Sequence, residues 1–366
     1  MNKILFYCSW GGFGHVARAY AVIKELPKNG KYFVATPEKW PFQKPNKNFK
    51  YINLPTPQSR NRFEGEKLIL QKYDPSAKDA SGYQKHVHEY INVLQKTKPD
   101  LVVVDNPAEI AIITKLLGYK TVSVYETLDT NDLRWRLVWG NVDKILVPYP
   151  KSFLNIAKFK YLNNAFCAGG YTRFDSVKKV DKQKARKELG LEKNSKYIAV
   201  TVGKGRSSED TIEKICKATK DFDYKVLMLY PSNTKAIKNI VKKYLHCIHI
   251  NTTSNKILSY LTASDMIISG AGYNSVMEVF YIQKPVIFIP LERVYNEQGF
   301  KTKSISKLGA AVILKTKEIT KNNLQKTISN FQNKKFVKKM LQAQKSIADG
   351  KGSSRAANEL VRLIKK

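Results

Sequence analysis

Short apolar runs of strand length alternate along the chain with segments in which apolar residues recur at helical spacing. In the first half, the runs predict strands at residues 3–8, 31–36, 51–54, 100–105, 121–125 and 144–148. Helices are predicted at residues 16–26, 80–96 and 107–117. The run at 100–105 is almost continuously apolar, which is typical of a strand in the middle of a parallel sheet. This alternation predicts an α/β domain.

The same alternation starts again after a turn-rich stretch at residues 168–175, which we interpret as the crossing between two domains. Further strands are predicted at residues 197–202, 224–230, 247–250, 265–269 and 284–290. Helices are predicted at residues 208–219, 235–244, 256–262, 274–281 and 298–308, with a helical tail from 322 that breaks at 349–352. We expect two α/β layers with a ligand cleft between them.

A small-residue loop in the second half carries the strongest chemical signal. Its sequence is Ser269-Gly-Ala-Gly-Tyr-Asn-Ser-Val-Met-Glu278, at the end of the strand predicted at residues 265–269, and it leads into the helix predicted at 274–281. Free backbone N–H groups and the positive end of the helix dipole suit an anion such as a diphosphate. Glu278, one turn inside the helix, can accept hydrogen bonds from the two vicinal hydroxyls of a ribose. The segment therefore predicts a nucleotide site in the second domain, with Ser269, Gly270, Ala271, Gly272, Asn274, Ser275 and Glu278 as its residues.

A second candidate site follows the first strand. Gly11, Gly12 and Gly14 allow a sharp turn that brings the backbone close to a ligand, and His15 stands at the mouth of the next helix. Asp105 ends another strand at the same sheet edge. It either orients His15 as a general base for an acceptor hydroxyl, or caps the helix that follows it.

Three further features have both a functional and a plain interpretation. Glu126 is either a second cleft carboxylate or an ordinary loop acid. The loop Gly203-Lys204-Gly205-Arg206 lacks the Walker A pattern; its basic side chains either neutralise a diphosphate or are simply solvated. Glu297 and Gln298 either hold sugar hydroxyls or mark only the start of a helix.

The charge is extreme, with 64 Lys+Arg against 30 Asp+Glu in 366 residues and a net charge of +34. It reflects either a lysine-rich proteome or attraction to a polyanion. The charge is spread along the chain without a nucleic-acid module, so an anionic membrane surface is the favoured partner and nucleic acid is not expected. Residues 60–78 are the candidate membrane or acceptor loop.

Composition also limits cofactors and location. Four cysteines lack C-x-x-C spacing, which argues against a zinc site and a disulfide framework and indicates a reducing compartment. We expect no metal and no cofactor. No apolar stretch approaches the length of a membrane span or a secretory signal. We expect a cytoplasmic protein, with peripheral attachment to the inner face of the cell membrane as one use of the charge.

Together these pieces resemble the GT-B glycosyltransferases. They are most similar to glycosyltransferase family 28, the peptidoglycan GlcNAc transferase family of MurG type, with similarity to UDP-glucuronosyltransferases and plant UDP-glycosyltransferases. The resemblance rests on the N-terminal glycine loop with His15, the strand ending in Asp105, the segment ending in Glu126, the loop at 203–206, the donor motif at 272–278 and the pair Glu297-Gln298. Three positions depart from the family pattern: Tyr125 and Gly270 stand where histidines are common, and Glu297 replaces an aspartate.

The resemblance implies a GT-B fold of two Rossmann-like domains with parallel sheets facing across a cleft. Residues 1–168 would form the acceptor and membrane-side domain, 169–345 the nucleotide-sugar domain, and 346–366 a helix packing back on the first domain. It also implies an inverting, metal-independent transfer of a sugar, most often from UDP-GlcNAc, to an envelope glycan or lipid-linked acceptor. His15, oriented by Asp105, would be the base; Arg206 or Lys204 would stabilise the diphosphate, and the nucleotide base would lie near Ile250.

Three other functions stay open. A UDP-GlcNAc 2-epimerase shares the fold and the nucleotide site. An NAD(P)-dependent oxidoreductase would use Gly12-Phe-Gly-His-Val-Ala17, which fits the dinucleotide fingerprint, although the acid expected to bind the ribose is Glu38, behind a proline. A charge-driven binding protein would need neither His15 nor a nucleotide.

Overall fold

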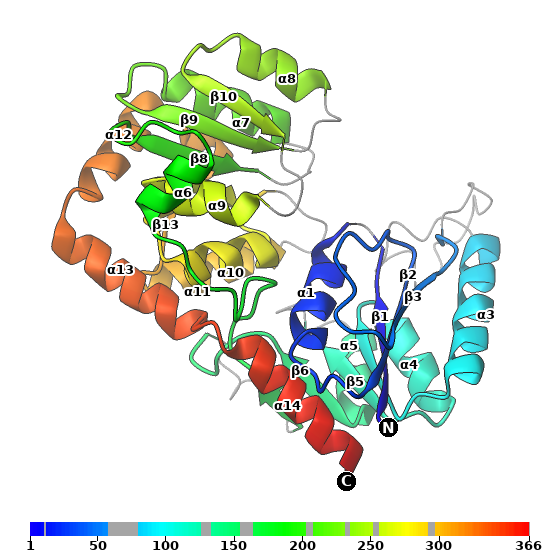
Figure 1. The fold of residues 1–366 in the computed structure, drawn as a ribbon. Coiled ribbons are helices and arrows are strands. Elements are labelled where there is room, and N and C mark those ends of the chain that lie inside the picture. Colours follow the sequence, from blue (N-terminus) through cyan, green and yellow to red (C-terminus); the bar gives the residue numbers. More distant parts are fainter. Residues whose placement is uncertain are drawn as a thin grey trace.

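The structure is a computed structural model that describes residues 1–10, 12–57, 80–125, 133–153, 164–202, 208–230, 235–251, 256–291 and 297–365 (Figure 1). Two separate sheets organise it. The first has the order β3-β2-β1-β4-β5-β6-β7, and all its strand pairs are parallel. Its strands are β1 (Lys3–Cys8), β2 (Lys31–Thr36), β3 (Phe49–Asn53), β4 (Leu101–Asp105), β5 (Thr121–Val124), β6 (Lys144–Val147) and β7 (Ala165–Cys167).

Helices cover both faces of this sheet, which explains why its central strands are apolar throughout. In β1, Ile4 and Phe6 pack toward α1 (Gly14–Ile23), whereas Leu5 and Tyr7 pack toward α3 (Ala80–Thr97). All five residues of β4 are buried. The helices α4 (Ala108–Leu116) and α5 (Leu133–Asn141) complete the second face.

The second sheet is also parallel throughout, with the order β10-β9-β8-β11-β12-β13. Its strands are β8 (Tyr197–Thr201), β9 (Lys225–Tyr230), β10 (Cys247–Asn251), β11 (Met266–Gly270), β12 (Val286–Ile289) and β13 (Val312–Ile313). Its helices are α6 (Lys182–Glu188), α7 (Ser208–Ala218), α8 (Lys235–Lys242), α9 (Ile257–Ala263), α10 (Tyr273–Ile282), α11 (Glu297–Lys307), α12 (Lys321–Asn330) and α13 (Lys334–Ile347). The expected GT-B class of two parallel-sheet α/β layers is confirmed.

Each sheet has one point where the direction of strand addition reverses. In the first sheet β1 lies between β2 and β4, and in the second β8 lies between β9 and β11. Crevices at the carboxyl ends of such strands are the usual ligand sites of open α/β sheets. The glycine loop with His15 follows β1, Asp105 ends β4, and the donor motif follows β11. The fold thus brings the main sequence candidates to the two reversal points.

The chain crosses between the domains twice, and the two crossings touch. The backbone N–H of Gly170 donates to the carbonyl of Ile347 at 2.7 Å, and a Cβ at Gly170 would lie 2.4 Å from the Met277 sulfur. The last helix, α14 (Gly352–Lys365), then runs back along the first domain (Figure 1). Its Ala356 and Leu360 are part of the buried cluster between α1 and the first sheet. Glycine at position 170 is required because the crossing leaves no room for a side chain.

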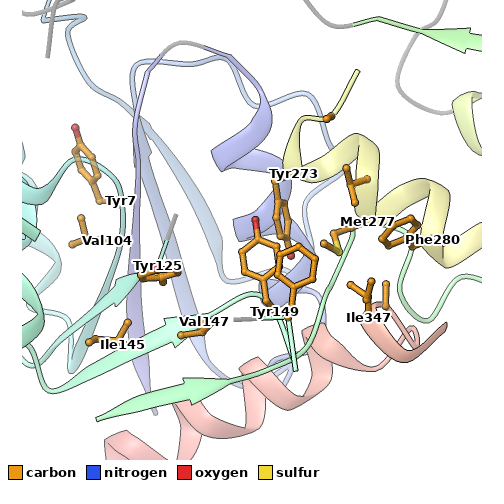
Figure 2. Close-up of a cluster of buried hydrophobic side chains, with 14 of the residues drawn as sticks. Tyr7, Val104, Tyr125, Ile145, Val147, Tyr149, Tyr273, Met277, Phe280 and Ile347 are labelled. Carbon is orange, nitrogen blue, oxygen red and sulfur yellow. The ribbon is translucent and has the colours of Figure 1, made fainter. Parts of the chain in front are cut away.

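A continuous buried cluster also joins the two domains. Tyr149, which follows β6, packs edge to face against Tyr273 of α10, with ring centroids 5.4 Å apart. Met277 and Phe280 of α10 and Ile347 extend this cluster (Figure 2). No helix in the described part of the chain is long and apolar enough to cross a membrane.

The pattern of apolar residues missed several features. β7 and β13 are too short for a periodic signal, and α6 is almost entirely charged. The helical tail breaks a second time before α13, where the Asn333 side chain accepts from the backbone N–H groups of Lys335 and Phe336. An asparagine cap of this kind is a readable signal that the periodicity alone did not use.

Candidate active site

The first half of the site is a buried cluster at the ends of β1 and β4. His15 lies in the first turn of α1, and its Nδ1 is 3.1 Å from Oδ1 of Asp105. The carboxylate is almost fully buried, whereas the imidazole keeps 15% exposure. α4 begins after Pro107 without a side-chain cap, and Asp105 faces His15 instead. Of the two interpretations of Asp105, the helix-capping one is wrong.

Arg18 completes this cluster, and the sequence analysis did not single it out. Its Nε and Nη2 donate to the two oxygens of Asp105 at 2.9 and 2.7 Å, and Nη2 also lies 2.9 Å from Nδ1 of His15. Burial raises the pKa of Asp105, but the charges and hydrogen bonds of Arg18 and His15 outweigh it and lower that pKa to about 2. The sequence feature that could have identified Arg18 was a basic residue one turn after His15, on a helix face that is otherwise buried and apolar.

The second half of the site is the uncapped start of α10. β11 ends at Gly270, Ala271 is fully buried, and Gly272 precedes the helix in an extended conformation without a side-chain cap. Ser269 is turned away, since its hydroxyl donates to the carbonyl of Thr201 at 3.1 Å. A Cβ at Gly272 would meet no heavy atom within 4 Å. Backbone N–H groups with open space before them form the arrangement that binds an anion.

Glu278 lies inside α10 and is paired with a cation from the domain crossing. Its Oε1 accepts from Nε of Arg173 at 2.8 Å, and both side chains are mostly buried. The sequence analysis interpreted residues 168–175 only as a crossing and missed Arg173. A lone arginine within a glycine- and aromatic-rich turn was the available signal.

The remaining described candidates lie around this second half. Ile250 is half-buried in the edge strand β10, and Ser275 is half-buried in the first turn of α10. Gln298 is buried and accepts from the backbone N–H of Leu291 at 2.9 Å, so its carbonyl oxygen holds the end of β12 in place. Lys301, one turn later, is buried with Nζ 3.3 Å from the Ala271 carbonyl, a basic group that the sequence analysis did not select.

Several predicted residues lie outside the described part of the chain. They are Gly11, Glu126, Gly203, Lys204, Gly205, Arg206 and the loop at 60–78. Glu297 is the first residue of α11, but its side chain is not among those described. Their roles stay predictions.

The two halves meet directly. The side-chain amide of Asn274, in the first turn of α10, donates to the carbonyl of Gly14 at 3.0 Å. The Arg18 guanidinium lies 5.1 Å from the centroid of the Tyr273 ring, a cation–π contact between α1 and α10. The phenol of Tyr273 is held in turn by the backbone of Tyr171. The histidine after β1 and the uncapped start of α10 therefore lie side by side, an arrangement that would suit a group transfer from a diphosphate.

The glycine loop itself is poorly suited to a dinucleotide. The backbone N–H of Gly12 donates to Oε1 of Glu38 at 3.0 Å. A carboxylate at this position occupies an amide that a pyrophosphate would need and repels its charge. This contact weighs against the oxidoreductase interpretation.

Comparison with known proteins supports the transferase interpretation. The model of the glycosyltransferase family 28 C-terminal domain matches residues 164–360. A UDP-N-acetylglucosamine–N-acetylmuramyl-(pentapeptide) pyrophosphoryl-undecaprenol N-acetylglucosamine transferase of Clostridium perfringens is 24% identical over 100% of this chain and 99% of its own length. The transferase of the same name from Caldicellulosiruptor saccharolyticus is 25% identical over 70% of each chain.

Solved structures agree on the fold. Acinetobacter baumannii MurG superposes with a TM-score of 0.65 at 16% identity, covering 100% of this chain and 99% of its own. The calicheamicin glycosyltransferase CalG4 superposes with a TM-score of 0.70 at 13% identity and the same coverage. A UDP-GlcNAc 2-epimerase from Neisseria meningitidis reaches 0.69 at 15% identity, covering 98% and 100%. The family match spans more than half of the sequence, and the chain therefore belongs to glycosyltransferase family 28.

Proposed function

We propose that this glycosyltransferase moves GlcNAc from UDP-GlcNAc to a hydroxyl of a lipid-linked envelope acceptor, with inversion at the anomeric carbon. The observation that carries the proposal is the contact between Asn274 and Gly14, which holds the start of α10 against the helix that bears His15. The relatives named as UDP-N-acetylglucosamine transferases support the choice of donor.

In this proposal α10 binds the leaving diphosphate. The uncapped N–H groups after Gly272 donate to the phosphate oxygens, and the helix dipole stabilises the charge that develops on them. Glu278 accepts from the ribose hydroxyls through the oxygen that Arg173 does not hold. The Lys301 ammonium, next to the Ala271 carbonyl, adds positive charge beneath the same loop.

His15 is the proposed general base. Asp105 orients the imidazole through Nδ1, and Nε2 is the nitrogen proposed to take the proton of the acceptor hydroxyl. That hydroxyl attacks the anomeric carbon while the bond to the diphosphate breaks on the opposite face. The product carries the inverted configuration, and the proton resides on His15 until it passes to solvent.

We propose that the reaction needs no metal. Among the described residues, no group of three or more acidic, histidine or cysteine side chains that could hold a metal ion is found. The helix dipole and nearby cations supply positive charge where some transferases use a divalent ion. Turnover should persist in excess EDTA, and loss of turnover that Mg²⁺ or Mn²⁺ restores would reject this part of the proposal.

We also propose that the first domain attaches to anionic membranes. Leu116 on α4 is 81% exposed and Leu137 on the neighbouring helix α5 is 53% exposed, within a chain of net charge +34. Apolar side chains together with basic charge favour the surface of an anionic bilayer. L116E/L137E should weaken sedimentation with phosphatidylglycerol vesicles, whereas L245E, at a fully exposed leucine of the second domain, should not.

The central experiment measures UDP release from UDP-GlcNAc with and without a lipid-linked acceptor, and determines the anomeric configuration of the product by NMR. Acceptor-dependent release with a β-linked product supports the proposal. Acceptor-independent formation of UDP-ManNAc would identify a 2-epimerase instead, and a retained α-linkage would reject the inverting mechanism.

A further inference from the structure

We infer that Arg18 is a positioning residue that keeps the His15 imidazole neutral, and therefore able to accept a proton, by compensating the charge of Asp105. This inference rests on the proposed role of His15 as the base. It assigns Arg18 a function in the reaction beyond holding the fold together.

The contacts of Arg18 are those of a complete charge pair. Its guanidinium forms two hydrogen bonds to Asp105, at 2.9 and 2.7 Å, and the side chain is 4% exposed. Bidentate arginine–carboxylate pairs are strong and geometrically rigid. The carboxylate next to His15 is thus already neutralised, and the pair carries no net charge toward the imidazole.

The same guanidinium touches the imidazole itself. Nη2 of Arg18 lies 2.9 Å from Nδ1 of His15, while Oδ1 of Asp105 lies 3.1 Å from the same nitrogen. The positive charge of the guanidinium disfavours a second proton on the ring, whereas the carboxylate accepts from Nδ1–H and favours the charged ring. The two contacts act on one nitrogen in opposite directions, and both bear on whether the ring is charged.

Burial keeps three other titratable groups packed around the cluster uncharged at neutral pH. Cys8 on β1, Tyr171 in the crossing and Tyr273 on α10 are buried, and burial raises the pKa of each. Glu38, beyond the glycine loop, is engaged with the backbone of Gly12. Arg18 and Asp105 are charged side chains that both contact the same nitrogen of His15.

The expected consequences have opposite signs for the two partners. In R18M an uncompensated carboxylate remains, which stabilises the imidazolium. In D105N an uncompensated guanidinium remains, which destabilises it. A base acts only when neutral, so the acid limb of kcat/KM against pH should move up by about one unit or more in R18M and down by a similar amount in D105N.

Two further variants separate charge from structure. R18M/D105N removes both charges, and its acid limb should return to within about half a unit of the wild-type position. R18K keeps the charge but loses the bidentate geometry, so the limb should stay while kcat falls. If Arg18 were only a structural element, R18M would lower kcat without moving the limb, and that outcome would overturn the inference.

A readout without substrate separates this inference from the proposed function. The ¹³Cε1 resonance of His15, assigned by its absence in H15A, is titrated by NMR in the full-length wild-type protein and in D105N, R18M and the double variant. Midpoints that move as above support the role of Arg18 even if no nucleotide sugar is turned over, in which case only the proposed function fails. Unmoved midpoints in both D105N and R18M overturn the inference, whatever the activity; should R18M not fold, D105N and the double variant decide.

Discussion

Two strand–loop–helix turns of this molecule have the same architecture and present opposite chemistry. The turn from β1 to α1 and the turn from β11 to α10 both lie at the carboxyl end of a central strand, both are rich in glycine, and both lead into helices without a side-chain cap. The first surrounds its helix start with the ionisable side chains of His15, Arg18 and Asp105. The second offers bare backbone, and its first acidic residue, Glu278, lies inside the helix.

The difference teaches how one building unit serves two tasks. Proton transfer needs a titratable side chain whose orientation is fixed by neighbours, and a buried charge pair supplies that orientation. Binding a diphosphate needs donors that keep their positions without repelling the ligand, which backbone N–H groups provide. The contact of Asn274 with Gly14 joins the two turns, so that the two proposed tasks would be performed next to each other.

The largest expected effect comes from removing the base in the first turn. H15A should lower kcat by about 10²- to 10⁴-fold, because general base catalysis typically contributes that much. The Kd for UDP should remain within a factor of two or so, since His15 belongs to the acceptor half of the site. Steady-state UDP release and calorimetric UDP binding measure the two quantities.

A matched control uses an exposed histidine of the same domain. H88A, on α3, should leave both quantities unchanged. A loss of UDP affinity in H15A comparable to its loss of turnover would mean that the first turn also binds the donor, and the division of tasks between the turns would be wrong.

The second-largest expected effect is on UDP binding and comes from changing Glu278, which follows the second turn. E278Q should weaken UDP binding about 10- to 100-fold, because it removes a charged acceptor of hydrogen bonds from the ribose while preserving shape. It should leave kcat at saturating donor largely intact. The control is E359Q on α14, which alters another buried glutamate that accepts from an arginine, the exposed Arg362. Equal UDP affinity in E278Q and wild type would show that the ribose lies elsewhere.

Some residues of these two turns could be predicted from the sequence, and others could not. The glycines, His15, Asp105 and Glu278 are contiguous with strong strand and helix patterns, so their places at the sheet edges could be predicted from the alternation of elements. Arg18 and Arg173 could not, because their partners lie about 90 or more positions away in sequence and the pairing depends on how the helices pack.

Shorter elements were missed for a related reason. β7 and β13 owe their conformation to pairing with β6 and β12, which no local periodicity reports. The interpretation of Asp105 likewise stayed open until the packing of α1 against β4 decided between a helix cap and a partner for His15. Contacts between distant segments, rather than local propensity, complete both the sheets and the site.

The charge cluster of the first turn should also appear in the pH dependence of stability. The pKa of Asp105 is lowered from 3.8 to about 2 in the folded protein, so its pairing stabilises the fold above about pH 4, and this contribution is lost as the pH falls toward 2. The contribution amounts to about 2 kcal/mol. Urea unfolding of wild type and D105N at pH 5, 4 and 3 should give free energies of unfolding that converge as the pH decreases. A constant difference between the two proteins would contradict this prediction.

The smallest expected effects come from adding one methyl group to each turn, by replacing Gly12 or Gly272 with alanine. The first substitution should affect stability and the second should affect UDP binding. At Gly12 the backbone has φ +134°, which an alanine adopts only with strain, so G12A should lower the free energy of unfolding by about 1–2 kcal/mol. At Gly272 φ is −65° and nothing lies within 4 Å of the added carbon, so G272A should keep the Tm. Its methyl group adds volume at the residue that precedes α10, where the diphosphate is proposed to bind, so UDP should bind about tenfold more weakly. A G272A protein with a lower Tm but normal UDP affinity would contradict this prediction. Glycine would then be needed for the backbone conformation in both turns and for ligand binding in neither.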